Sequence, residues 1–154
     1  MDVRKLIGAF VLLAACHRGQ TSTSPGQMSA PIPGVTSGAA DPAGALRAYL
    51  GAVKAQDLQA MSLIWGTAQG PARASMEREY LEKAELIIVR CLTHDSFDVI
   101  GDAPGIAGKR VYAVALKRRD LTRTTNFNVV PGPGGRWYVE SVDMEPLQQF
   151  CNSR

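Results

Sequence analysis

The spacing of apolar residues changes once along the chain, from a helical period to an alternating one. Between residues 41 and 92, apolar side chains recur every three or four positions, as on one face of a helix. From residue 96 onward, apolar and polar side chains alternate, which is the spacing of a half-buried strand. The pattern predicts an α+β domain at 41–154, in which three helices precede about four antiparallel strands.

Two aspartates mark where the first two helices are expected to begin. Asp41 precedes Pro42, and this pair favours a helix start because Asp caps free N–H groups and Pro is tolerated in the first turn. Asp57 predicts the cap of a shorter second helix, which Gly66 ends. Gly51 lies within the first helix, where glycine is unfavourable, and indicates the close approach of a strand or a ligand.

A third helix is predicted to run without a break from Ala72 to Leu92. Its charged side chains, Glu85 among them, are expected mostly on the solvent side. Its buried stripe is expected to consist of Met76, Tyr80, Ala84, Ile87 and Cys91, with Leu81 and Ile88 beside it.

Segments rich in glycine and proline separate the expected strands. Such segments lie at 101–108 and 131–135, which are predicted to form a loop and a turn. A last helical turn is expected at 145–151. The strands are predicted at 96–100, 109–118, 122–130 and 136–142.

The first fifteen residues have the features of an export signal. Arg4 and Lys5 precede an apolar run at 6–15. As a helix this run would span about 15 Å, half of a hydrocarbon core of about 30 Å. The segment 1–15 is therefore predicted to be a secretory signal peptide rather than a membrane-spanning helix.

The signal ends in Leu13-Ala14-Ala15-Cys16, which resembles the lipobox of bacterial lipoproteins. The resemblance implies that the Cys16 thiol takes a diacylglyceryl group, that a peptidase cuts before Cys16, and that fatty acids such as palmitate anchor the chain firmly. The chain is thus expected to be exported and held on the cell envelope. An ordinary secretory signal with an incidental Cys16 is the alternative.

The residues after Cys16 indicate which membrane holds the chain and predict a flexible spacer. His17 is not the aspartate that often retains a lipoprotein in the inner membrane, so the outer membrane is favoured. Residues 16–40 are dominated by Ser, Thr, Gly, Pro and Ala, a composition typical of a flexible linker.

Two more cysteines, Cys91 and Cys151, remain if Cys16 carries lipid. In an oxidising compartment two such thiols usually pair. A disulfide would close a loop of about 60 residues and contribute about 4 kcal/mol. Two buried free thiols are the alternative, and a metal site is disfavoured because no CxxC or clustered His accompanies them.

Charge gives no argument for a nucleic-acid partner. The whole chain has a net charge of +3, but from Asp41 onward 14 Lys and Arg stand against 13 Asp and Glu. A local basic cluster is expected to blunt strand edges, or to meet anionic lipid or an acidic partner. It consists of Lys109, Arg110, Lys117, Arg118, Arg119 and Arg123.

Three short patterns make residues 41–150 resemble the NTF2-like, cystatin-like α+β superfamily and its small bacterial lipoproteins. These are Ala-Leu-Arg-Ala-Tyr-Leu at 45–50, Asp-Leu at 57–58, and Gly-Gly-Arg-Trp-Tyr-Val-Glu-Ser-Val at 134–142. The resemblance implies a curved sheet wrapped around helices as an open cone. Members include isomerases, dehydratases and many non-catalytic modules.

No catalytic motif of fixed spacing occurs in the sequence, and no cofactor or metal is expected. His94-Asp95 is an adjacent acid–base pair, but neighbours on a strand point to opposite sides, which disfavours a dyad. Aromatic residues are candidates for lining a pocket, although aromatics at helical spacing are more often core. These candidates are Tyr49, Trp65, Tyr80 and Trp137.

Together these features predict an envelope lipoprotein whose domain is a non-catalytic module that binds a protein partner or a small apolar ligand. One alternative is an enzyme of lyase or isomerase type that uses the cone interior. Another is a structural tether of the envelope. A cavity with convergent titratable groups would favour the enzyme, and an apolar cavity would favour ligand binding.

Overall fold

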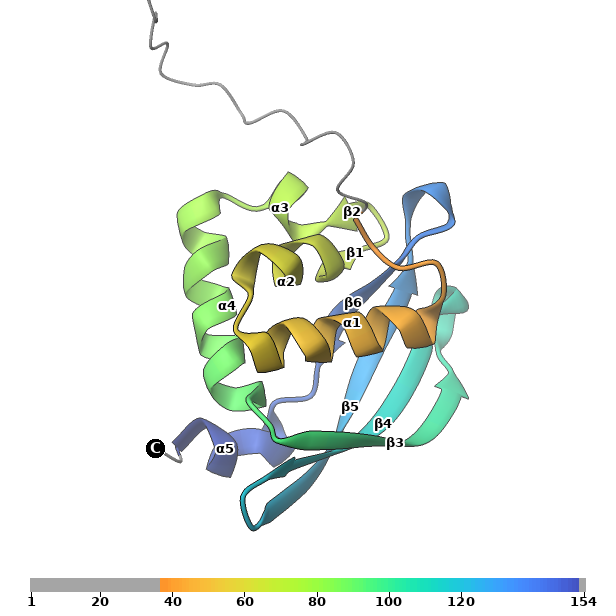
Figure 1. Cartoon of the computed structure of the whole chain (residues 1–154). Helices are drawn as coiled ribbons and strands as arrows, with labels where there is room; N and C mark the ends of the chain where they lie inside the picture. The colour runs from red at the N-terminus through yellow and green to blue at the C-terminus, as the bar shows by residue number, and fades with distance from the viewer. Residues whose placement is uncertain (1–36, 153–154) are drawn as a thin grey trace, which may run out of the picture. The chain divides into compact units, whose positions relative to one another are not determined.

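A computed structural model describes residues 37–152, which form an α+β domain built on one curved antiparallel sheet (Figure 1). The predicted signal peptide, the lipobox with Cys16, and all but the last residues of the predicted linker lie outside the described residues.

Four helices precede the main sheet within this part of the chain, with a two-stranded pairing between the second and the third. The helices are α1 (Pro42–Ala55), α2 (Leu58–Ile64), α3 (Ala72–Ser75) and α4 (Arg78–Leu92), and the short pair is β1 (Gly66–Thr67) and β2 (Gly70–Pro71). The sheet has the order β3 (Ser96–Pro104), β4 (Arg110–Arg118), β5 (Leu121–Pro131), β6 (Trp137–Val142). Single 3₁₀ turns follow β3, β5 and β6, and α5 (Gln148–Asn152) comes last.

The first two helices begin where the aspartates predict. The Asp41 carboxylate accepts a hydrogen bond from the Gly44 N–H at 2.7 Å, and the Asp57 carboxylate accepts one from the Ala60 N–H at 3.0 Å. Each bond satisfies one N–H that the first helical turn leaves free. The expectation for Gly51 is wrong, because a Cβ added there would meet nothing within 4 Å.

The predicted third helix is two helices, and its buried face differs from the expected one. The chain breaks at Met76 and Glu77, and the Glu77 carboxylate caps α4 by accepting from the N–H groups of residues 79 and 80. The expected stripe is wrong at Tyr80 and Ile87, which are 65% and 64% exposed. The face turned inward carries Leu81 and Ile88, which were expected beside the stripe, together with Glu85, Val89 and Leu92.

The strand β3 is longer than the sequence indicated. It continues through Gly101 to Pro104, past a shift in register with β4 between Val99 and Gly101. Glycine and proline argued for a loop there, but β3 is an edge strand, where a missing N–H or side chain is tolerated. The loop expected at 101–108 therefore shrinks to the residues between β3 and β4.

The helices cover one face of the sheet, and the core lies between the two layers. In Figure 1, α1 crosses in front of β5 and β6, which it contacts, and α4 stands across the left ends of α1 and α2 and contacts both. The buried Tyr49 ring of α1 meets the Phe127 ring of β5 edge to face, with centroids 6.5 Å apart. Tyr112, Val114 and Leu116 of β4 are buried on the same side, so every other residue of that strand faces the helices.

Residues 37–40 already contact the domain, which was predicted to begin at Asp41. The Gly38 N–H donates to the Leu63 carbonyl, and Ala39 forms a two-way bridge with Trp137. The Arg136 guanidinium also donates to the carbonyls of residues 37 and 38. The last residues of the expected linker thus add to the edge of the sheet beside β6.

The C-terminal segment packs against α4, as the cysteines predict. The sulfur atoms of Cys91 and Cys151 lie at disulfide distance, with their Cα atoms 4.1 Å apart. The Arg90 side chain donates to the Cys151 carbonyl at 2.8 Å. The helical turn expected at 145–151 is present as a 3₁₀ turn followed by α5.

Across residues 37–152, no helix combines the length and the apolar composition that crossing a membrane requires.

Candidate functional site

A small cavity lies between the helices and the last strand of the sheet. It has a volume of about 210 Å³. Its apolar walls come from α1, α4, β6 and the turn after each of α2 and β6. The lining residues are Tyr49, Trp65, Ile88, Val139, Glu140, Ser141, Val142 and Met144.

A bulge in β6 shapes the rim of this cavity. Asn128 of β5 pairs with Ser141 and the next residue of β5 pairs with Val139, so Glu140 has no partner across the ladder. Such a bulge turns the extra residue out of the regular hydrogen-bonding pattern. The indole N–H of Trp65 donates to the Glu140 carbonyl at 3.3 Å, and Trp65 also bridges Val139 in parallel. The ring of Trp65 is thereby fixed at the cavity.

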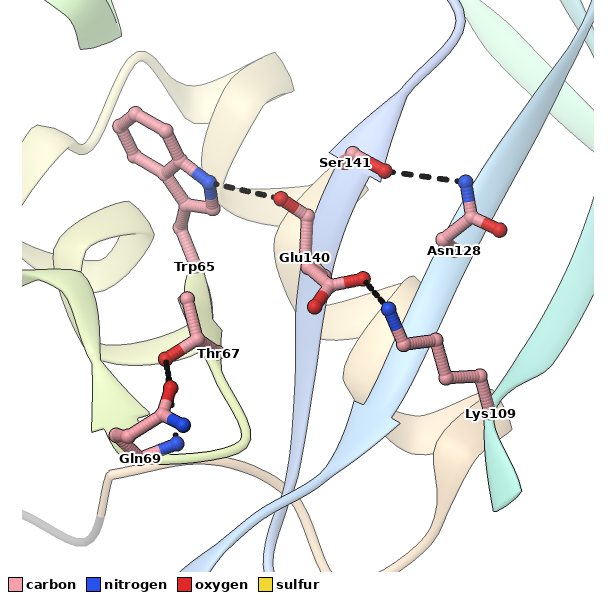
Figure 2. A network of polar contacts seen from close by, with 7 residues as sticks. All are labelled: Trp65, Thr67, Gln69, Lys109, Asn128, Glu140 and Ser141. Atoms are coloured by element: carbon pink, nitrogen blue, oxygen red, sulfur yellow. Dashed lines mark hydrogen bonds and ion pairs between the residues drawn. The ribbon is translucent and has the colours of Figure 1, made fainter. Parts of the chain in front are cut away.

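Polar contacts surround the same bulge, as Figure 2 shows. The Glu140 carboxylate lies between Trp65 and Lys109 and forms a partly buried ion pair with the Lys109 ammonium. The Asn128 amide donates to the Ser141 hydroxyl at 3.0 Å across β5 and β6. The Glu140 charge is therefore compensated by the protein itself.

The fully buried Tyr49 forms part of the cavity wall. Burial, and secondly the negative charge of Glu85, raise the pKa of the Tyr49 hydroxyl above its usual range. The phenol therefore stays protonated at any physiological pH and keeps its ability to donate a hydrogen bond.

Glu85 of α4 is an unusual buried carboxylate, because it is 1% exposed and its Oε1 atom has no hydrogen-bond partner among residues 37–152. Burial is the main cause that raises its pKa to about 7, the charge of Glu82 adds to the rise, and Arg73 opposes it. The expectation that Glu85 faces solvent is wrong. The signal that sequence reasoning missed is its spacing of four from Leu81 and Val89, which places it on the apolar face.

The four aromatic candidates do not come together in one place. Tyr49 and Trp65 both line the cavity. Tyr80 points away from the core on the outer side of α4, since the inward face of that helix is the one that carries Leu81. Trp137 begins β6 and pairs with Ala39, at the opposite end of the strand from Val142.

His94 and Asp95 do not form a dyad. His94 is 3% exposed, with Nδ1 at 2.8 Å from the Leu92 carbonyl and the ring edge-on to Phe97. Its Nε2 atom has no partner in the described part of the chain. Burial is the main cause that lowers the pKa of His94. Asp95 is exposed, and its carboxylate accepts from the Arg119 N–H at 2.6 Å. His94 is therefore a core residue.

Three residues of the basic cluster have separate partners in the fold. Lys109 pairs with Glu140, and Arg110 pairs with Asp102 at 2.5 Å. Arg118 donates to the Phe150 carbonyl at 3.0 Å. These side chains tie strands to one another and to the C-terminal segment.

A second hollow, of about 390 Å³, lies outside the core where α2 meets α4. It is larger but more open, and charged Arg90 and Arg118 are among its lining residues. We regard the smaller cavity as the candidate site, because its walls are more apolar and the buried Tyr49 forms part of them. Within residues 37–152, no three His, Cys, Asp or Glu side chains gather as metal ligands.

Comparison of the chain with protein-family models, curated proteins and solved structures gave no match.

Proposed function

We propose that this chain is a lipoprotein of a bacterial cell envelope, anchored through Cys16, whose domain binds a small apolar ligand. The anchor rests on the lipobox-like run that ends at Cys16, after a signal too short to span a bilayer. The pairing of Cys91 with Cys151 supports an oxidising compartment, which an exported domain would occupy. The spacer composition before Ser37 suits a domain held away from a membrane surface.

The domain is proposed to be an NTF2-like cone. The curved sheet with helices on one face supports this assignment, as does the order of helices before strands. The observation that carries the binding role is the apolar cavity of about 210 Å³. A dry cavity of about 150 Å³ accommodates benzene, so this one suits a ligand of about one ring.

The anchor is tested by replacing Cys16 with Ser and by blocking the lipoprotein signal peptidase with globomycin. Lipidation needs the thiol, so Cys16→Ser protein is expected to incorporate no labelled palmitate and to leave the membrane fraction or remain uncleaved. His17→Ala is the matched control and is expected to be labelled like the wild type. Normal palmitate labelling of the Cys16→Ser protein would contradict the anchor.

The ligand role is tested by filling the cavity with Ile88→Trp. A larger side chain there occupies the space beside Tyr49 and Met144. Small molecules extracted with the purified wild-type chain, identified by mass spectrometry, are expected to be lost in this variant. The neighbouring Ile87→Trp lies on the exposed side and is expected to retain them. Equal recovery from both variants would place the ligand elsewhere.

A second candidate function is an isomerase or lyase, favoured by the buried Glu85, whose charge acts on Tyr49 of the cavity wall. A carboxyl group with a pKa near 7 is suited to proton transfer at neutral pH. A protonated tyrosine can stabilise a developing oxyanion. Such an enzyme would release a converted molecule, whereas the binding module would release the molecule it bound. Incubating extracted ligand with wild-type and Glu85→Gln chains distinguishes the two.

A further inference from the structure

Two turns at one end of the main sheet contain no carboxylate, and the fold compensates their cations. They are the β3–β4 turn at 105–109 and the β5–β6 turn at 132–136, and we call the surface that they form the two-turn end. The Lys109 ammonium pairs with Glu140, and the Arg136 guanidinium donates to two backbone carbonyls. Moving the two-turn end out of bulk water would therefore leave no charge without a partner.

Ile106 projects from the β3–β4 turn and is 89% exposed, more than any other large apolar side chain of the described residues. Two hydrogen bonds close this turn. The Gly105 N–H donates to the Lys109 carbonyl at 2.8 Å, and the Lys109 N–H donates to the Ile106 carbonyl at 3.3 Å. A single exposed isoleucine is ordinary by itself, so the meaning of Ile106 depends on where it lies in the molecule.

The segment that leads back to Cys16 leaves the domain at the two-turn end. The carbonyl of Ser37, the first described residue, accepts from the Arg136 guanidinium at 3.1 Å, so the chain enters beside the β5–β6 turn. The two turns also adjoin each other, because a Cβ added at Gly108 would lie 3.8 Å from the ring of Pro131. The most exposed isoleucine and the attachment point of the proposed tether thus share one end of the sheet.

Basic residues gather at the opposite end of the sheet. In Figure 1 the β4–β5 turn lies at the lower left, whereas the β3–β4 and β5–β6 turns lie at the right and upper right. The β4–β5 turn holds Arg119 and Asp120, and Lys117 and Arg118 directly precede it. Docking of these basic residues on anionic lipid would turn the attachment point of the tether away from the membrane.

We propose that the two-turn end rests on the membrane that holds the lipid anchor, with the Ile106 side chain in the layer between headgroups and acyl chains. The proposal rests on the proposed anchor at Cys16. As a flexible chain, residues 17–36 would span about 25 Å on average, so the two-turn end is the part of the domain nearest the membrane. The tether makes docking intramolecular, and a weak apolar contact then suffices.

The chemistry of this contact predicts which lipids it needs. Burial of an isoleucine depends on apolar area rather than on charge. Docking is therefore expected on purely zwitterionic lipid and is expected to change little with salt. A basic surface would behave differently, because its attraction to anionic lipid is screened by salt.

The test places a fluorophore at either end of the sheet in the full lipidated chain. Nitrobenzoxadiazole is attached to one introduced cysteine, in Ala107→Cys beside Ile106 or in Asp120→Cys at the opposite turn, both at exposed positions. The chains are held in phosphatidylcholine vesicles that contain some lipid with a nitroxide on its headgroup, which quenches only nearby fluorophores. Quenching at residue 107 is expected to exceed quenching at residue 120, both in about 0.1 M and in about 1 M salt.

A second change in the Ala107→Cys chain assigns the contact to one side chain. Ile106→Asp replaces the apolar group with a charge and is expected to lower the ratio of docked to free domain at least about tenfold. Ile87→Asp, at another exposed isoleucine on α4, is the matched control and is expected to leave quenching unchanged. Both positions are exposed, so both variants are expected to keep the circular dichroism of the wild type.

The outcomes separate this inference from the anchor on which it rests. Equal quenching at residues 107 and 120, in chains that float with the vesicles, would overturn the docking and leave the anchor. Stronger quenching at residue 120, or quenching at residue 107 that survives Ile106→Asp, would also overturn the inference. Chains that do not float with the vesicles would overturn the anchor and the inference together.

Discussion

Within the part of the chain that the structure describes, two buried ionisable side chains, Glu85 and His94, each keep one polar atom without a hydrogen-bond partner. Burial acts on both in the same way, by disfavouring the charged form, and so shifts their pKa values in opposite directions. The folded domain prefers a protonated Glu85 and a neutral His94. These two residues should therefore give the stability of the domain its pH dependence at either side of neutrality.

The first consequence is that Glu85→Gln stabilises the domain at alkaline pH. The folded-state pKa of about 7 lies above the ordinary value of 4.5, so the stability that the protonated form supplies is complete below 4.5 and is lost as pH rises through 7. At about pH 8 the variant is expected to gain about 2–3 kcal/mol in the free energy of unfolding. At about pH 4 it gains nothing.

Urea unfolding at a series of pH values measures this gain. Glu79→Gln, the exposed match on the same helix, is expected to change the unfolding free energy by less than about 0.5 kcal/mol at any pH. A Glu85→Gln gain that is the same at acid and alkaline pH would show that ionisation of Glu85 is not its cause.

His94 should make the domain sensitive to acid. Its folded-state pKa lies below the ordinary 6.5, so the stability it supplies is complete above 6.5 and is lost as pH falls below that value. His94→Leu cannot take up this proton and is expected to lose less stability between about pH 6.5 and pH 5 than the wild type does. Equal losses in the two proteins over that interval would rule out His94 as the source.

At the level of helices and strands, a helix cap, an edge strand and a bulge explain where the structure differs from the elements that the apolar spacing predicts. The Glu77 cap starts α4 afresh after α3, and the new helix turns Leu81 rather than Tyr80 toward the core. The strand β3 passes through Gly101 because an edge strand requires hydrogen bonds on one side alone. In β6 the bulge at Glu140 frees a carbonyl that holds Trp65 against the cavity.

The link between α4 and α5 is expected to carry part of the domain's stability. The pair Cys91 and Cys151 closes a loop of 60 residues. Replacing both with Ala is expected to lower the free energy of unfolding by about 2–4 kcal/mol, because the unfolded chain regains its freedom. Chemical denaturation of the variant and of the wild type, each without reductant, measures the difference. The same midpoint for both proteins would mean that the bond does not form in the folded chain.

At the scale of the whole molecule, the sequence was most informative where one residue decides the local structure. The caps Asp41 and Asp57, the cysteine pair, and the α+β order could all be predicted, because each depends on local chemistry or on a clear period. The inward position of Glu85 could not be predicted. A glutamate among charged neighbours is expected on the solvent side of a helix, and only tertiary packing fixes how the helix is rotated about its axis.

The candidate site was predictable only in part, for a related reason. Tyr49 and Trp65 meet in one cavity because α1, the turn after α2, and β6 come together in space. Nothing local in the sequence specifies that meeting. The bulge at Glu140 is equally hidden, since it depends on the register between β5 and β6.

The most direct test of the account is the intact mass of the chain extracted from cell membranes. The extracted protein is expected to begin at Cys16 and to carry a glyceryl group with at least two acyl chains. Cys91 and Cys151 are expected to resist alkylation until a reductant is added. A membrane-extracted chain that still begins at Met1, or that carries an unmodified Cys16, would contradict the account.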